Sequence, residues 1–105
     1  MNNIDRYGET VFDRIRRIDA DGEEFWYARG LQKALGYTEW RNFMKVIARA
    51  MDACAGSGVP VGECFVEVNK TSPMPHGGEK LKLDIMLSRY ACYLIAMNGD
   101  PSKEV

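Results

Sequence analysis

The chain of 105 residues has no hydrophobic run long enough to cross a membrane, because a transmembrane helix needs roughly 18 or more consecutive apolar residues. Its N-terminus also lacks the apolar core of a secretory signal peptide. The apolar fraction of 46% and the charged fraction of 28% are typical of a folded domain rather than of a disordered chain. We therefore expect a cytoplasmic protein that does not bind a membrane.

Histidine and cysteine are too few to indicate a metal site or an acid–base catalyst. His76 is the single histidine, and Cys54, Cys64 and Cys92 are 10 and 28 residues apart, which fits neither a zinc site nor a redox pair. The chain has no metalloprotease, nucleophile-elbow or phosphate-loop motif either. The acids of segment 19–24 flank a turn, a place where Asp is common for structural reasons. We expect no enzyme activity, no metal and no cofactor, and reduced cysteines with Cys92 in a core.

An excess of positive charge is also missing. The 14 Lys and Arg residues are offset by 15 Asp and Glu residues, which gives a net charge of −1 and an isoelectric point near 5.8. Proteins that bind nucleic acid non-specifically usually carry a broad basic field. Any contact of this chain with DNA must therefore come from a local group of basic side chains.

The N-terminal part predicts a short helix followed by a β-hairpin. Apolar side chains at helical spacing predict the helix over residues 9–17. These side chains are Val11, Phe12, Ile15 and Ile18. Residues 21–22 (Asp-Gly) predict a two-residue type I′ turn, which requires positive φ at both central residues. In the following run 25–27 (Phe-Trp-Tyr), strand alternation places Trp26 on the face opposite to its neighbours, so we expect at least one face to lie in the core.

Two helices are expected next, over residues 28–35 and 39–55. Gly36 ends the first helix at the position where helices commonly place glycine, and Thr38 is a suitable N-cap for the second. The second helix has an apolar stripe that we expect to be buried. The stripe consists of Trp40, Phe43, Met44, Ile47 and Met51.

This pair of helices has the outline of a helix-turn-helix. However, the positions that such a motif buries in its second helix fall on Asn42 and Lys45. We therefore favour an ordinary helical hairpin packed on a sheet. We also expect Trp26 and Trp40 to be structural residues rather than platforms on which bases stack.

The second half predicts two paired strands and a helix. Residues 65–68 and the alternating run 81–85 predict the strands, and segments 56–62 and 71–78 predict loops. A helix is expected over residues 86–98, with apolar side chains at the spacing of a core-facing stripe. The members of this stripe are Leu87, Tyr90, Ala91, Leu94 and Ile95.

The last residues predict the start of another helix, with Asp100 as its N-cap and Pro101 in its first turn. We therefore expect the domain to continue past Val105. The whole pattern predicts an α+β fold in which β-hairpins pack against three or four helices. Residues 1–105 are expected to form a single domain, truncated at its C-terminus, with residues 1–14 as an N-terminal extension.

A row of basic residues on the second long helix is the best candidate for contact with DNA. Arg41, Lys45 and Arg49 follow one another at four-residue spacing and can meet successive phosphates, while Asn42 is a residue type that reads adenine edges. Further positive charge around the strand pair comes from Lys70, Lys80 and Lys82. A solvated helix face has the same pattern, and the residues alone leave both interpretations open.

Three ordered stretches resemble the N-terminal domain of the BRO family. They are FWYARGLQKALGY (25–37), TEWRNFMKVIARAMDACAGSG (38–58) and LSRYACYLIAMNGDPSKEV (87–105). The second and third are similar in particular to the DNA-damage-inducible branch of that family, and the likeness covers roughly residues 15–105. The resemblance implies a small α+β module of DNA-binding type, found in bacterial SOS-associated and prophage antirepressor-like proteins.

Two kinds of partner are candidates for such a module, DNA and another protein. The resemblance implies DNA, either double-stranded or single-stranded, whereas the near-neutral charge favours a protein-interaction or dimerisation module. In the second case the domain docks on a repair or repressor protein, or forms a homodimer. Gly30 stands where relatives often have a polar or acidic residue and weakens the first helix by about 1 kcal/mol relative to alanine. This departure argues against a role for that helix in recognition.

Overall fold

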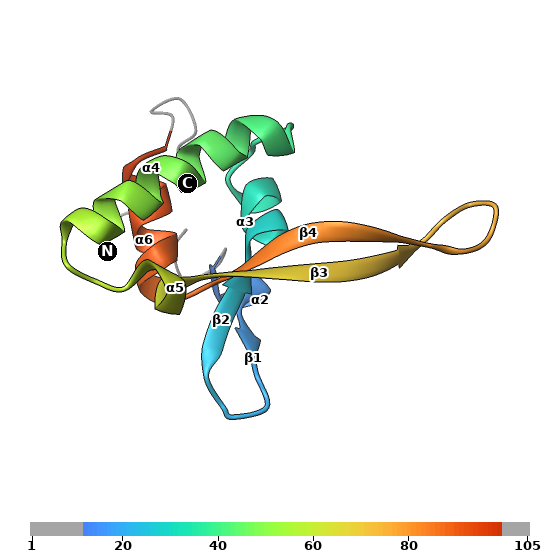
Figure 1. Ribbon diagram of the computed structural model, residues 1–105, viewed down its shortest axis with the longest axis horizontal. Coiled ribbons are helices and arrows are strands. Elements are labelled where there is room, and N and C mark those ends of the chain that lie inside the picture. Colours follow the sequence, from blue (N-terminus) through green and yellow to red (C-terminus); the bar gives the residue numbers. More distant parts are fainter. Residues whose placement is uncertain (1–11, 100–105) are drawn as a thin grey trace.

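The computed structural model describes residues 12–99, which form helices packed against an antiparallel sheet (Figure 1). In chain order the elements are α2 (Asp13–Ile15), β1 (Arg17–Ile18), β2 (Glu24–Tyr27), α3 (Ala28–Ala34), α4 (Trp40–Gly56), α5 (Val61–Cys64), β3 (Phe65–Pro73), β4 (Glu79–Leu87) and α6 (Arg89–Met97). The strand order is β1-β2-β4-β3, and each neighbouring pair is antiparallel. This architecture confirms the predicted α+β class. None of the helices described is long and apolar enough to cross a membrane.

The predicted hairpin at residues 17–27 is present, but its turn is not type I′. The Asp19 amide donates to the Glu23 carbonyl at 2.9 Å, and the Gly22 amide donates to the Asp19 carbonyl at 3.0 Å. Gly22 has a φ of 82°, but Asp21 does not have the positive φ that a type I′ turn also requires, because all positive φ values among the described residues belong to glycines. This pattern is a type I turn closed by one left-handed glycine. The Asp19 side chain favours it, because its Oδ1 accepts the amides of Asp21 and Glu23, each at 2.9 Å.

The N-terminal helix ends earlier than predicted. Its last residue is Ile15, at the end of α2, rather than Arg17, and residues 9–11 of the predicted segment lie outside the part of the chain that the structure describes. The two residues of β1 are extended because their backbones pair with β2. As a result Ile18 is 55% exposed and does not join the predicted stripe. Phe12 and Ile15 do pack against the core.

Helix α3 ends at a left-handed glycine, as predicted. Gly36 has a φ of 81°, and the amides of Gly36 and Tyr37 donate to the carbonyls of Lys33 and Gln32 at 3.1 and 3.0 Å, respectively. This pair of hydrogen bonds is a Schellman motif, which satisfies the last carbonyls of the helix. The buried Gln32 side chain also donates to the Tyr37 carbonyl at 3.0 Å, which fixes the connection to α4.

The start and the buried face of α4 both differ from the prediction. Thr38 is not the N-cap; Glu39 occupies that position, and its carbonyl accepts the Phe43 amide at 3.1 Å. The buried residues are Phe43, Val46, Ile47, Ala50 and Cys54. Three members of the predicted stripe, Trp40, Met44 and Met51, are only half-buried. The face is rotated because α4 packs chiefly against α6 and also contacts α3 and α5, so that side chains on its other flank, such as Val46 and Ala50, are buried.

Helix α6 starts three residues later than the predicted segment 86–98, because Ser88 caps it. The Ser88 hydroxyl oxygen accepts the Ala91 amide at 3.0 Å. Leu87 therefore belongs to β4, and Tyr90 is 36% exposed instead of buried. The remaining members of the stripe are buried, as is Cys92; they are Ala91, Leu94 and Ile95.

Two other predictions concern loops and ends. The sequence predicts a loop over segment 56–62, but the last residues of this segment begin α5, for which Pro60 is the N-cap. A proline fits there because the first amides of a helix have no partner within it. The helix expected from Asp100 onward lies outside the described residues.

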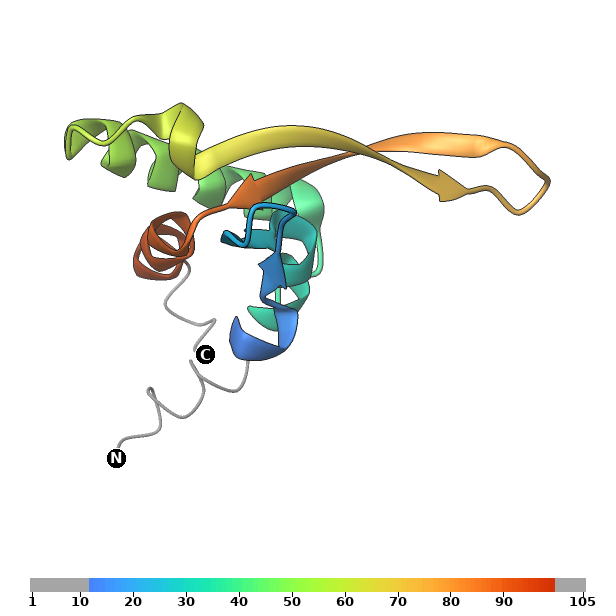
Figure 2. The same ribbon diagram turned by 90° about the horizontal axis from the view of Figure 1, so that it is seen from below.

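Strands β3 and β4 form a two-stranded ribbon that projects from the body of the protein (Figures 1 and 2). We refer to its outer part, residues 69–83, as the arm. The predicted pairing of the two strands is confirmed, but it extends out to Pro73 opposite Glu79. The predicted loop 71–78 therefore shrinks to a turn at residues 74–78. The arm accounts for the elongated shape of the molecule, 47 × 30 × 30 Å.

The core lies where α3, α4 and α6 pack against the inner ends of the strands. Its largest fully buried apolar side chains are Trp26, Phe43, Leu31, Ile47, Ile85, Leu87 and Ile95. Each contributes roughly 1.5–3 kcal/mol of hydrophobic stabilisation. The burial of Trp26 between two half-buried neighbours confirms the predicted alternation in β2. The outer part of the arm lies outside this core, since Leu81 is 68% exposed.

Candidate nucleic-acid interface

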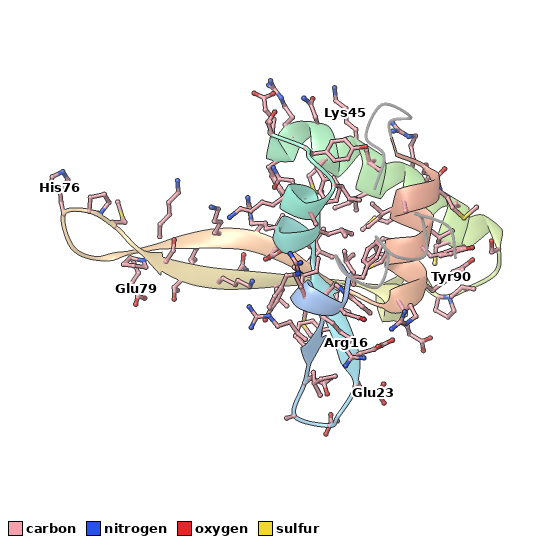
Figure 3. The ribbon with its side chains drawn as sticks, turned by 180° about the vertical axis from the view of Figure 1, so that it is seen from behind. Arg16, Glu23, Lys45, His76, Glu79 and Tyr90 are labelled. Atoms are coloured by element: carbon pink, nitrogen blue, oxygen red, sulfur yellow. The ribbon has the colours of Figure 1, made fainter. Side chains whose placement is uncertain are left out.

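The basic row predicted on α4 lies on its exposed side. Arg41, Lys45 and Arg49 are all exposed, and Lys45 points away from the body (Figure 3). Four-residue spacing on a helix places the three side chains along one stripe. Among the described residues, neither Arg41 nor Lys45 is in an ion pair. The charges of these two residues are therefore available to an anionic partner.

The two other candidates on α4 are engaged within the protein. Arg49 donates from Nε and Nη2 to the Asn98 carbonyl at 3.3 and 3.1 Å, at the negative C-terminal end of α6. Asn42 donates from Nδ2 to Glu39 Oε2 at 3.3 Å. Both side chains line a shallow depression of about 340 Å³, together with Lys45. Arg49 thus also serves to tie α4 to α6.

The pairing register of the arm places its three lysines on one face. Lys70 lies opposite Lys82, and Lys80 is two residues from Lys82, so all three side chains share a face. Glu79 lies on the other face, which Figure 3 shows on the side of the arm away from α4. Lys80 therefore points to the face of the arm opposite Glu79, and Lys82 shares that face.

Lys70, at the base of the arm, is held by two neighbours. Its Nζ lies 2.9 Å from Asp84 Oδ2 and 3.1 Å from the centre of the Tyr27 ring. Asp84 is only 1% exposed, and a buried carboxylate needs a partner of opposite charge. Lys70 therefore secures the arm, whereas Lys80 and Lys82 form no ion pair among the described residues.

Arg29 connects the arm to both neighbouring helices. Its backbone amide donates to Asp84 Oδ1 at 3.1 Å, and its Nε donates to the Leu83 carbonyl at 2.7 Å. Its guanidinium lies over Trp40, 4.0 Å from the ring centre. Asp84 thus stabilises the N-terminal end of α3 from another element, and the base of the arm is fixed against the first turn of α4. The contact also gives Trp40 a structural role.

Lys33 extends the group of exposed cations, although it is not among the residues predicted from the sequence. It is exposed and lies one turn after Arg29 on the same face of α3. Gly30 argues against a role for this helix in recognition, yet the helix packs on β4 at the base of the arm. The signal that could have identified Lys33 is its four-residue spacing from Arg29, the same spacing that singled out the row on α4.

The described residues offer little for metal binding or thiol chemistry. They contain no group of three His, Cys, Asp or Glu side chains that could hold a metal ion. Cys54, Cys64 and Cys92 are reduced and buried. Burial raises the pKa of Cys92 to about 12 and also raises the pKa of Cys54. Such thiols are protonated at neutral pH, and the protonated form is a poor nucleophile and metal ligand.

The fold and the site together define a small α+β domain whose candidate residues lie on an exposed surface rather than in a closed cleft. Residues 14–105 match the BRO family, N-terminal domain, and the chain belongs to this family. It is 45% identical over 94 residues to DNA damage-inducible protein D of Escherichia coli (strain K12). The matched region covers 90% of this chain but 34% of that relative, so the chain spans about a third of the relative's length. No solved structure matches the chain.

Proposed function

We propose that this domain is a non-catalytic module that binds duplex DNA through one basic face. The basic face consists of Lys33, Arg41, Lys45, Lys80 and Lys82. The observation that carries the proposal is that the exposed cations of the arm and of α4 form no ion pair among the described residues, while the strand register places Lys80 and Lys82 on the face of the arm opposite Glu79. Lysine and arginine side chains arranged in this way contact phosphates.

The distribution of the acids supports the same proposal. The net charge of the chain is −1, so a basic face requires that acids lie elsewhere. Figure 3 shows Glu23 at the turn of the β1–β2 hairpin, on the other side of the arm from Lys45, and Glu79 on the arm's opposite face. One acid, Glu39, does lie beside Lys45, at the same depression. The position of Glu23 and Glu79 elsewhere still leaves a local excess of positive charge that can attract DNA, even though the chain as a whole does not.

The shape of the arm fits duplex DNA better than a single strand. A two-stranded β-ribbon is narrow enough to enter the major groove, and β-ribbons are established readers of both grooves. Base-stacking platforms for single strands are less apparent, because Trp26 is buried and Trp40 is covered by Arg29. The relative's name links it to DNA damage, and we propose a role in the DNA-damage response or in phage regulation.

The test is binding of a fluorescent duplex and of its single strand over a series of salt concentrations. Lys80→Ala/Lys82→Ala and Arg41→Ala/Lys45→Ala should each weaken duplex binding about tenfold or more, because each removes two phosphate contacts. Each pair should also reduce the slope of log K against log [salt] by about 2.

The matched control is Arg14→Ala/Arg16→Ala, which removes two charges outside the basic face and should leave affinity within about twofold of wild type. If wild type does not bind, if its binding is insensitive to salt, or if the control weakens binding as much as the two test pairs, the proposal is wrong.

Contact with another protein is a second candidate, favoured by an apolar stripe on α6. Tyr90, Tyr93 and Met97 are 36%, 66% and 68% exposed and lie at helical spacing. Such a stripe can pack against a second copy or another protein. Light scattering over a concentration series tests it: a dimer that Tyr93→Ser/Met97→Ser abolishes supports this function, and a monomer at all concentrations rules out the homodimer.

A further inference from the structure

The turn at the end of the arm, residues 74–78, carries a small apolar group that the basic face leaves unexplained. We propose that this turn is a wedge, which inserts Met74 and Pro75 between two base pairs of a bound duplex and bends the DNA. The inference rests on the proposed function and specifies how the duplex is held. Met74 is 47% exposed, and Figures 1 and 2 show from two directions that the turn points away from the body.

The turn is closed by its own hydrogen bonds, which fix the backbone that carries these side chains. The Met74 amide donates to the Gly78 carbonyl, and the Gly77 amide donates to the Met74 carbonyl, each at 3.1 Å. Gly77 and Gly78 have φ values of 93° and 80°, a backbone conformation that other residues rarely adopt. Figure 3 shows His76 at the far end of the arm. A preformed tip loses little conformational entropy when it binds.

The prolines of the tip exclude another use for it. An exposed pair of strands can bind a further strand along its edge. Pro73 and Pro75 lack the amide that such pairing requires, and they lie on either side of Met74. The tip is therefore poorly suited to recruit a strand, and its apolar side chains are left as its binding groups.

The charges along the arm supply the other requirement of a wedge. Inserting an apolar side chain between base pairs costs a few kcal/mol of stacking, which contacts along the bent duplex offset. Lys80 and Lys82 lie behind the tip on one face, where they can contact phosphates, and Glu79 points to the other face. Methionine and proline are among the side chains that proteins insert in this way, and the unbranched Met adapts to the gap.

The experiment measures bending and affinity on the same complex. A duplex of about 30 base pairs, labelled at its ends with a donor and an acceptor, reports bending as energy transfer, and anisotropy reports affinity. Wild type should raise the transfer. Met74→Ser/Pro75→Ser should return it to the value of free duplex and weaken binding about tenfold, while the salt slope stays unchanged because the lysines remain.

Two further measurements make the result specific. A central mismatch, which lowers the stacking cost, should tighten binding of wild type but not of the tip variant. Val66→Ser removes an apolar side chain of similar exposure (43%, against 47% for Met74) from β3 outside the arm, and should bend DNA like wild type. Binding without a rise in energy transfer, or a tip variant that still bends the duplex, overturns the wedge alone. A wild type that does not bind overturns the proposed function as well.

Discussion

Asp84 lies 1% exposed at the base of the arm, between two elements that its carboxylate joins. Asp84 Oδ2 lies 2.9 Å from the Lys70 ammonium. This contact is an ion pair without the alignment of a hydrogen bond. Asp84 Oδ1 accepts a hydrogen bond from the Arg29 backbone amide. Removing a carboxylate from water costs several kcal/mol, which these contacts must offset. Asp84 therefore helps to fix the position of the arm relative to α3, together with the bond from Arg29 Nε to the Leu83 carbonyl.

Replacement of Asp84 tests this role at the scale of one residue. Asp84→Ala should lower the free energy of unfolding by about 2 kcal/mol, because it leaves the N-terminal end of α3 and the Lys70 ammonium without their buried partner. Urea denaturation followed by tryptophan fluorescence measures the loss. Glu67→Ala removes an exposed acid from β3 and should change stability by less than about 0.5 kcal/mol. A loss for Asp84→Ala no larger than that of this control would contradict the assignment.

At the scale of elements, β2 and α6 are joined by an ion pair on the surface. Arg89 donates from Nε and Nη2 to the two carboxylate oxygens of Glu24 at 2.7 and 3.0 Å, and Arg16 lies 3.5 Å from the same carboxylate. The hydrogen bond from Arg89 holds the pKa of Glu24 below its ordinary value of 4.5. The Glu24 side chain is 32% exposed, so solvent screens much of this interaction.

The sign of the pH dependence follows from the lowered pKa. Glu24 contributes stability above pH 4.5, its ordinary pKa, and loses that contribution as the pH falls through its lower folded value. Glu24→Gln should therefore lower the free energy of unfolding by up to about 1 kcal/mol at pH 7. It should have no effect at a pH low enough to protonate Glu24 in both the folded and the unfolded protein. Urea midpoints at neutral and at acidic pH measure the difference. Glu23→Gln, at the exposed hairpin turn, should show neither effect; an acid-insensitive cost for Glu24→Gln would refute the prediction.

At the scale of the whole molecule, the arm and the body have separate tasks. The core residues lie in the body, whereas the outer arm carries the exposed Leu81 and Met74 and the two available lysines. Replacing residues 72–80 with Asn-Gly joins the strands by a two-residue turn in the same register. Because no core contact is lost, the free energy of unfolding should change by less than about 1 kcal/mol.

The same variant should lose most of its affinity for duplex DNA, because Lys80 and the tip are gone. Thermal melting and anisotropy measure the two properties on one sample. The variant Arg14→Ala/Arg16→Ala again serves as the control for DNA affinity. Unfolding of the shortened protein would show that the arm stabilises the body, and undiminished DNA affinity would show that the arm is not part of the interface.

Much of the fold could be predicted because its signals are local. Gly36 ends α3 through a conformation that glycine favours, and the alternation around Trp26 is set by strand geometry alone. The candidate site was only partly predictable. Lys70 looks like Lys80 and Lys82 in the sequence, but it is engaged by Asp84, a residue that comes close only when the two strands pair.

The sequence by itself determined the α+β class, the membership of the family and the order of the main helices and strands, because these depend on side-chain periodicity and on local turn chemistry. The tertiary structure decided which face of α4 is buried, since that depends on its contact with α6. It also decided where β4 ends and α6 begins, through the cap at Ser88. Finally, it decided which basic residues remain available, because a charge is engaged or exposed only in relation to neighbours that folding brings together.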